Sequence, residues 1–236
     1  ITAVIGNWVR SRAKGVIEGF DYGTAGEIDK LEVESIKTVL NHGFIPIFPC
    51  IGWNSIGHPY NISSMLLAQQ VAINLKADKL FYVSQEGVID NHRFNIPQEF
   101  ALSEKGNVPA MNLDEVDSFI KENPNLDDLT RGLLQSAREA CSNGVTRVHL
   151  LDGKEDGSLL CEIFSDLGSG TMIYTSNYGK IRPMLQTDIP AVLGIMRPFV
   201  KAGKLLARTE EDLSSSFQDY LVYELDGGVH GCAALH

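Results

Sequence analysis

The strongest constraint on the fold of this chain is the alternation of apolar strand patterns with amphipathic helix patterns. Apolar side chains recur at helical spacing over residues 33–40, and the apolar run at 44–51, limited by two prolines, predicts a buried strand. A longer helix, capped by Asn61 or Ser63, precedes the predicted strand Lys79–Val83. Short strands that alternate with helices form right-handed parallel crossovers. The order therefore predicts an α/β layer fold.

The flanking segments extend this pattern. Residues 1–12 and 24–33 predict two strands of a ribbon, and the later elements are helices at 113–121 and 126–142, a strand at 146–151, a helix at 157–165 and a strand at 171–174. We interpret the last three as a second βαβ unit, with Gly168–Gly170 as a tight turn. Residues 84–111 are polar and predict a loop with at most a short helix.

A hydrophilic segment at residues 175–180 predicts a break between domains. Beyond it the order changes to a strand, a helix capped by Thr187 or Asp188, a second helix, and two strands joined by the hairpin signal Asp226–Gly228. We therefore predict two domains, residues 1–177 and residues 178–236. The strand-like patterns at both ends of the sequence predict that it is a fragment of a longer protein.

The charge balance argues against several classes of partner. Twenty Lys and Arg stand against 30 Asp and Glu, a formal net charge of −10, and such a field repels nucleic-acid phosphates and anionic lipid headgroups. No apolar run reaches the roughly 20 residues of a membrane span. The four cysteines include no CxxC pair, so neither a disulfide framework nor a metal site is predicted. These features predict a cytoplasmic protein that binds neither nucleic acid nor membrane.

Phosphate-binding loops are missing from the sequence. GxxxxGK[ST] does not occur, and the glycine-rich stretch Gly168–Thr171 precedes a strand rather than a helix N-terminus that would bind phosphate. The Arg/Gln-x-x-Gly-x-Gly/Ala loop that binds the pyrophosphate of coenzyme A is also absent. We therefore predict no cofactor-binding residue within this chain.

Two places carry polar residues with a candidate role. His149 on a predicted strand and Glu162 on the next helix can clamp a cationic amino acid, although a core histidine and a solvated glutamate are the alternative. Arg208, between the last two helices, can hold a carboxylate bidentately. Its alternative role is that of a surface residue that caps the acidic turn Glu210–Asp212.

Several longer motifs occur in a fixed order. They are Gly6–Val9, Gly15–Tyr22, Asn61–Ser63, Gln69–Ile73, Lys76–Leu80, Gly144–Leu150, Asp156–Phe164, Gly168–Ile173, Ile181–Pro183, Ile195–Pro198 and Gly231–Leu235. Together they resemble bacterial-type N-acetylglutamate synthases over essentially the whole chain. The resemblance implies an α/β amino-acid-kinase-like parallel-sheet sandwich, followed by the N-terminal part of a GNAT α+β acetyltransferase domain.

This resemblance implies an acyltransferase that moves acetyl from acetyl-CoA to the α-amine of L-glutamate, the first step of arginine biosynthesis, under feedback inhibition by L-arginine. His149, Glu162 and Gly168 match the family's arginine-site positions, while Leu206 and Arg208 match positions that contact glutamate. Glu162 is then expected to pair with a cationic group of the ligand. Acetyl-CoA is expected as co-substrate, without a tightly bound cofactor, and the resemblance implies a hexamer.

The same resemblance places the catalytic residues beyond His236, so the isolated chain is expected not to acetylate glutamate. Two alternatives stay open. One is a non-catalytic arginine-sensing module, and the other is an N-acetylglutamate kinase. Such kinases resemble Thr-Asp-Val-x-Gly-Val where this chain has Ser84-Gln85-Glu86-Gly87-Val88, and the missing aspartate argues against phosphoryl transfer.

Overall fold

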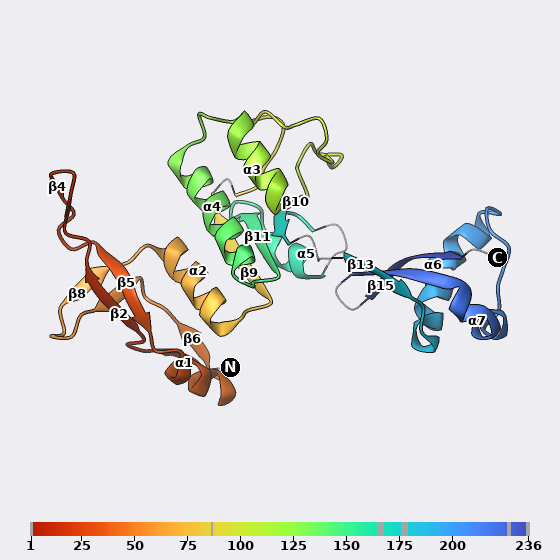
Figure 1. The fold of residues 1–236 in the computed structure, drawn as a ribbon, viewed down its shortest axis with the longest axis horizontal. Helices are drawn as coiled ribbons and strands as arrows, with labels where there is room; N and C mark the ends of the chain where they lie inside the picture. Colours follow the sequence, from red (N-terminus) through yellow and green to blue (C-terminus); the bar gives the residue numbers. More distant parts are fainter. Residues whose placement is uncertain (1, 86, 165–167, 176–178, 226–227, 235–236) are drawn as a thin grey trace. The chain divides into compact units, whose positions relative to one another are not determined.

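The chain divides into two compact units, Ile1–Thr175 and Ser176–His236 (Figure 1). The computed structural model describes residues 2–85, 87–164, 168–175, 179–225 and 228–234. The predicted domain boundary after residue 177 lies outside these described residues, as does residue 86 of the stretch compared with the kinases.

The first half of the first unit is built on a four-stranded sheet of order β5-β2-β7-β8. Its strands are β2 (Val9–Ala13), β5 (Gly26–Leu31), β7 (Ile51–Trp53) and β8 (Pro59–Asn61), and the small hairpin of β3 (Val16–Ile17) and β4 (Phe20–Asp21) extends from it. β2 and β5 pair antiparallel, as the predicted ribbon requires. The prediction of one strand over residues 1–12 is wrong, because β1 (Ala3–Ile5) precedes β2 and lies in a different sheet. The helix α1 (Val33–Asn41) follows β5 and ends where Gly43 adopts a φ of 77°.

The prediction of one buried strand at residues 44–51 is wrong. The segment forms two short strands, β6 (Ile45–Ile47) and β7, which join different sheets: β6 pairs in parallel with β1 (Ala3–Ile5), and β7 lies beside β2. Ile45 and Ile47 are 49% and 46% exposed. Pro46 and Pro49 lack the N–H groups that a continuous central strand would donate, so the chain changes sheet between them.

A second four-stranded sheet, of order β10-β12-β11-β9, forms the other half of this unit. Its elements are α2 (Ser64–Leu75), β9 (Lys79–Ser84), β10 (Ala110–Asn112), α3 (Leu113–Glu122), α4 (Asp128–Ser142), β11 (Arg147–Asp152), α5 (Ser158–Phe164) and β12 (Thr171–Tyr174). The helices begin at side-chain caps, since Ser63 caps α2, Asn112 forms a capping box with Glu115, and Asp127 caps α4.

Strand direction in this sheet corrects one prediction. β9 and β11 are parallel, as a crossover through α4 requires, but β12 runs antiparallel to β11 and parallel to β10. The helix 157–165 therefore does not close a second parallel βαβ unit. The seven-residue α5 returns the chain to the end of the sheet at which β11 finishes, because it is too short to carry the chain back along the strand.

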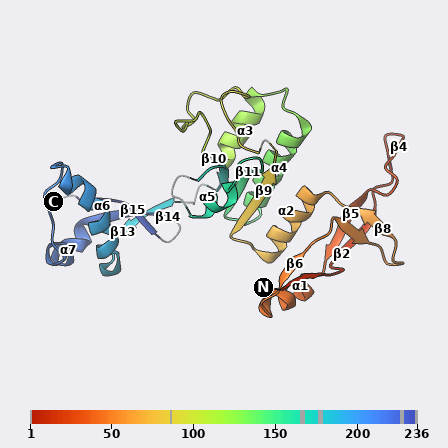
Figure 2. The same ribbon diagram turned by 180° about the vertical axis from the view of Figure 1, so that it is seen from behind.

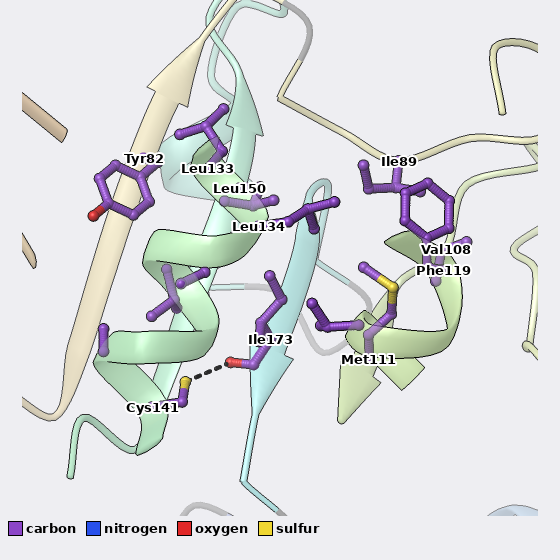
Figure 3. Close-up of a cluster of buried hydrophobic side chains, with 14 of the residues drawn as sticks. Tyr82, Ile89, Val108, Met111, Phe119, Leu133, Leu134, Cys141, Leu150 and Ile173 are labelled. Carbon is purple, nitrogen blue, oxygen red and sulfur yellow. Dashed lines mark hydrogen bonds between the residues drawn. The ribbon is translucent and has the colours of Figure 1, made fainter. Parts of the chain in front are cut away.

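The main core lies between this sheet and the helices α3 and α4. Leu134 and Leu150 are packed beside Ile173 of β12, while Met111 and Phe119 are packed on its other side (Figure 3). The Cys141 thiol donates to the Ile173 carbonyl at 3.5 Å, and burial raises its pKa to about 11. This thiol is part of the core and is unreactive in this position.

The second unit is built on a three-stranded antiparallel sheet (Figure 2). It has a small hydrophobic core of its own. Its elements are β13 (Gly179–Pro183), α6 (Ile189–Lys201), α7 (Glu210–Ser216), β14 (Tyr220–Leu225) and β15 (Gly228–Ala234), with 3-10 turns at Gln186–Asp188 and Phe217–Asp219. Asp188 precedes α6 but does not cap it through its side chain. That carboxylate instead accepts from the Arg182 guanidinium at 2.7 and 3.0 Å and from Leu185 N–H at 2.8 Å.

Candidate functional site

The structure brings His149, Glu162 and Gly168 together at one end of the second sheet. His149 projects from β11, Glu162 from α5, and Gly168 lies in the loop that enters β12. The three residues lie at the same end of the sheet because the short α5 returns the chain there before β12 begins. We name this group, with Phe81 on the neighbouring strand, the His149 cluster.

The Glu162 carboxylate is the centre of the His149 cluster. One oxygen lies 2.5 Å from His149 Nδ1, and the other accepts from the N–H groups of Ser169 and Gly170 at 2.7 and 2.9 Å. Burial raises the pKa of Glu162, but the hydrogen bonds from the imidazole and the two backbone groups hold it below its usual value. An ionised carboxylate is therefore held inside the protein by three donors.

The imidazole of His149 is fixed from a second side as well. The Phe81 ring stacks on it with centroids 4.7 Å apart and an interplanar angle of 17°, and the two residues are register partners on the parallel strands β9 and β11. His149 is 5% exposed. Its Nε2 atom is buried and has no hydrogen-bond partner among the described residues.

Gly168 is required by both conformation and space. Its φ of 63° lies in the left-handed region, which strains other residues, and a Cβ atom there would lie 2.6 Å from an oxygen of Glu162. A side chain at this position would therefore displace the carboxylate that orients the imidazole.

A second candidate site lies in the second unit, where Arg208 lines a cavity of about 330 Å³. Its other lining residues come from α6, from the segment between α6 and α7, and from the strands β14 and β15: Ile195, Met196, Phe199, Leu205, Tyr220, Cys232, Ala233 and Ala234. Leu206 is 82% exposed and is not among the lining residues. Thr209 forms the capping box of α7. The bonds from Thr209 and the charge of Arg208 both lower the pKa of Asp212 in the first turn of that helix, so the alternative role of Arg208, as an exposed residue beside the acidic turn, stays open.

A third, polar cleft of about 220 Å³ lies where β9 and β11 end. Asp90, Asp152 and Glu155 line it, together with Arg93, which donates to Asp90 at 2.8 Å. Within the described ranges, no group of three or more His, Cys, Asp or Glu side chains could hold a metal ion. The same part of the chain contains no helix that is long and apolar enough to cross a membrane.

The comparisons with known proteins agree with this architecture. The model of the amino acid kinase family matches residues 4–152, more than half of the chain. The chain belongs to the amino acid kinase family. The predicted α/β class with parallel strand pairs is therefore confirmed for the first unit, which we call the amino acid kinase unit.

Similarity to curated relatives extends beyond the amino acid kinase unit. Amino-acid acetyltransferases of Actinobacillus pleuropneumoniae and Vibrio cholerae are 35% and 34% identical to this chain, over its whole length and 52% of theirs. The chain thus spans about half the length of these relatives. The predicted resemblance to N-acetylglutamate synthases is confirmed at this level.

Solved structures show the same relationship. N-acetylglutamate synthase from Neisseria gonorrhoeae, complexed with coenzyme A and L-arginine, aligns with 99% of this chain and 51% of its own at 32% identity, with a TM-score of 0.76. The same enzyme complexed with coenzyme A and N-acetyl-glutamate gives a TM-score of 0.64. A carbamate kinase from Giardia, 13% identical with a TM-score of 0.50, shares the fold alone.

Sequence reasoning missed Phe81 of the His149 cluster and the two backbone donors to Glu162, Ser169 and Gly170. Phe81 faces His149 only through the pairing of two strands that are far apart in the sequence, and nothing in its local pattern signals that partner. The other two act through backbone N–H groups, which every residue other than proline has. The local signal for them is the glycine-rich stretch 168–170, which predicts a turn rather than a pair of donors.

Proposed function

We propose that this chain forms part of an amino-acid N-acetyltransferase, a glutamate N-acetyltransferase that is feedback-inhibited by L-arginine. The proposed reaction is acetyl-CoA plus L-glutamate to N-acetyl-L-glutamate plus coenzyme A, the entry to arginine biosynthesis. The observation that carries the proposal is the match over 99% of this chain, through both units, with the structure of an N-acetylglutamate synthase from Neisseria gonorrhoeae. A sensing module unrelated to acetyltransferases would match such a structure through its first unit only.

The proposed arginine site is the His149 cluster. A buried, ionised Glu162 beside an imidazole with an unpartnered Nε2 offers negative charge and an acceptor, which suit a guanidinium or ammonium group. A backbone carbonyl at Gly168 is proposed as a further acceptor. The structure adds one refinement to the sequence expectation, because Glu162 already accepts from three protein donors and acts as much by orienting the site as by pairing with the ligand.

The proposed glutamate end is the cavity beside Arg208, where a guanidinium at an otherwise apolar wall suits the α-carboxylate of an amino acid. Leu206, the other residue implied by the resemblance, is proposed to contact substrate from the rim, since its side chain is exposed. The α-amine must lose a proton before it attacks the thioester carbonyl, and N–H donors must stabilise the oxyanion. We assign neither role to a residue of this chain.

Because the chain spans about half of its relatives' length and has no coenzyme A loop motif, we propose that it does not acetylate glutamate by itself. Coenzyme A release above the blank, from the isolated chain with acetyl-CoA and L-glutamate, would contradict this. We also propose that the whole protein has the length of its relatives and is a cytoplasmic homohexamer. Sedimentation and cell fractionation test these two points.

The kinase alternative receives little support from the polar cleft at the ends of β9 and β11. Three carboxylates line it, and its one guanidinium is bonded to Asp90, so its charge repels nucleotide phosphates. Calorimetry with ATP and Mg²⁺ is expected to give no binding, and saturable binding would restore that alternative.

Calorimetric titration of the chain with L-arginine tests the proposed regulation. We expect one site per chain, weaker or absent binding of L-glutamate at that site, and loss of arginine binding in Glu162→Ala. Glu122→Ala is the matched control, because Glu122 is an exposed glutamate on another helix of the same unit. Equal affinity of the Glu162→Ala variant and the wild type would refute the site.

Acetyl transfer has a separate test in the reading frame that encodes the chain. We expect an Arg/Gln-x-x-Gly-x-Gly/Ala motif downstream of residue 236, and a stop codon in its place would favour the non-catalytic sensor.

A further inference from the structure

We propose that Phe81 is a positioning residue of the His149 cluster, which holds the imidazole so that the lone pair of Nε2 accepts an N–H from the cationic ligand. This inference deepens the proposed function, since it rests on the His149 cluster being an amino-acid site. Nε2 is the protein atom that contacts the cation, and Phe81 is the side chain that orients it.

Two contacts leave the His149 ring little freedom. The Phe81 ring is nearly parallel to it, with an interplanar angle of 17° and 4.7 Å between the centroids, and this stacking fixes the plane of the imidazole. The bond of 2.5 Å from Nδ1 to Glu162 then fixes its rotation within that plane. Both restraints are needed, because a carboxylate alone allows the ring to tilt about the hydrogen bond.

The hydrogen bonds of Glu162 decide the tautomer. Its second oxygen accepts from Ser169 N–H and Gly170 N–H, and these donors favour the ionised carboxylate. An ionised carboxylate can only accept, so Nδ1 carries the proton that it shares with Glu162. In the neutral ring Nε2 is then a lone-pair acceptor, oriented in the way that second-shell carboxylates orient metal-binding histidines.

The lone pair of His149 Nε2 requires a hydrogen-bond donor. Nε2 is buried and has no partner among the described residues, and a buried unsatisfied polar atom is destabilising. Other charged groups lie on the same sheet face: Arg147 two residues earlier on β11, and Lys79 opposite it on β9. The register partner of His149 on β12 is the uncharged Met172, so Glu162 supplies the negative charge next to the ring. A guanidinium or ammonium group fits both the unpartnered acceptor at Nε2 and the negative charge of Glu162.

The test combines nitrogen NMR of ¹⁵N-histidine-labelled chain with arginine titration. Without ligand, we expect the His149 Nδ1 signal at the protonated position and the Nε2 signal at the unprotonated position. L-arginine should shift the Nε2 signal. In Phe81→Leu we expect broadened His149 ring signals, because the ring can tilt about its bond to Glu162, and an arginine dissociation constant raised about fivefold, the loss that one aromatic stack predicts. Phe81→Tyr should restore both readouts because it keeps the ring.

The matched control is Phe94→Leu, which makes the same change at an aromatic pair outside the cluster, where Phe94 meets Phe119 edge-on at 5.6 Å. It should leave the His149 signals and the arginine affinity unchanged. A protonated Nε2 in the wild type, or a Phe81→Leu variant with wild-type ring signals and arginine affinity, would overturn the inference. If Phe81→Leu broadens the ring signals but the wild type binds no arginine, the proposed arginine site is refuted and the positioning role of Phe81 is supported.

Discussion

Replacement of Glu162 by glutamine tests whether the carboxylate holds this end of the amino acid kinase unit together. Glutamine has nearly the same shape but keeps one acceptor oxygen, while its amide nitrogen can only donate. The oxygen can stay with the Ser169 and Gly170 N–H groups or with His149, but not with both. In either arrangement the amide nitrogen faces a former donor, and all three bonds lose their charge assistance.

The magnitude follows from those three bonds, whose lengths are 2.5, 2.7 and 2.9 Å. Hydrogen bonds to charged groups contribute about 1.5–3 kcal/mol each and neutral ones about half of that. Losing the charge assistance of all three therefore predicts a decrease of about 3 kcal/mol in the free energy of unfolding. The imidazole can recover part of this by moving its proton to Nε2, which would replace the acceptor that we propose for the ligand with a donor.

Urea unfolding followed by tryptophan emission is the appropriate assay, because both tryptophans, Trp8 and Trp53, lie in the first unit. A decrease of about 3 kcal/mol corresponds to a lower midpoint by roughly 1 M urea. Amide hydrogen exchange at Ser169 and Gly170 should speed up in the same variant. The control Glu122→Gln removes the same charge from an exposed position and should change stability by less than about 0.5 kcal/mol. If Glu162→Gln unfolds at the wild-type midpoint with wild-type exchange, the three bonds do not stabilise the unit and our account of the cluster is wrong.

Three further predictions concern backbone strain, pH and the second core. Gly168→Ala should decrease the free energy of unfolding by at least about 1 kcal/mol and also weaken arginine binding, because its Cβ displaces Glu162. The control Gly43→Ala, at a φ of 77° with no atom within 4 Å of the new Cβ, should decrease stability alone. Equal effects of the two variants on arginine binding would contradict this. The bonds from Arg182 lower the pKa of Asp188, so as the pH falls the carboxyl is protonated in the unfolded chain before it is protonated in the folded one. The second unit should therefore lose stability below about pH 4. In acid unfolding followed by NMR, Asp188→Asn should reduce this dependence of stability on pH. Leu213→Ala removes a side chain that is 0% exposed and should destabilise the second unit by about 3 kcal/mol, while the tryptophan transition of the first unit stays at the wild-type midpoint; a shifted transition would show that the two units unfold together.

The helices of this chain were predictable because their signals are local. Apolar spacing and side-chain caps lie within a few residues of each helix end, so the predicted ranges 113–121 and 126–142 agree with α3 and α4 to within two residues. Strand partners are not local. The run at 44–51 has the composition of a buried strand, yet its residues join two sheets, and the sequence carries no record of which neighbour each strand meets.

The error in strand direction bears on the site itself. Had β12 continued parallel to β11, the loop that enters it would lie at the other end of the sheet, about a strand length from the place where β11 finishes. The observed antiparallel register sets Leu150 opposite Thr171, which brings the N–H groups of residues 169 and 170 beside the carboxylate on α5. The proximity of His149 to Glu162 could be inferred from their positions on a strand and the next helix. The state of that pair could not, because the donors that keep the carboxylate ionised arrive only with the reversed strand.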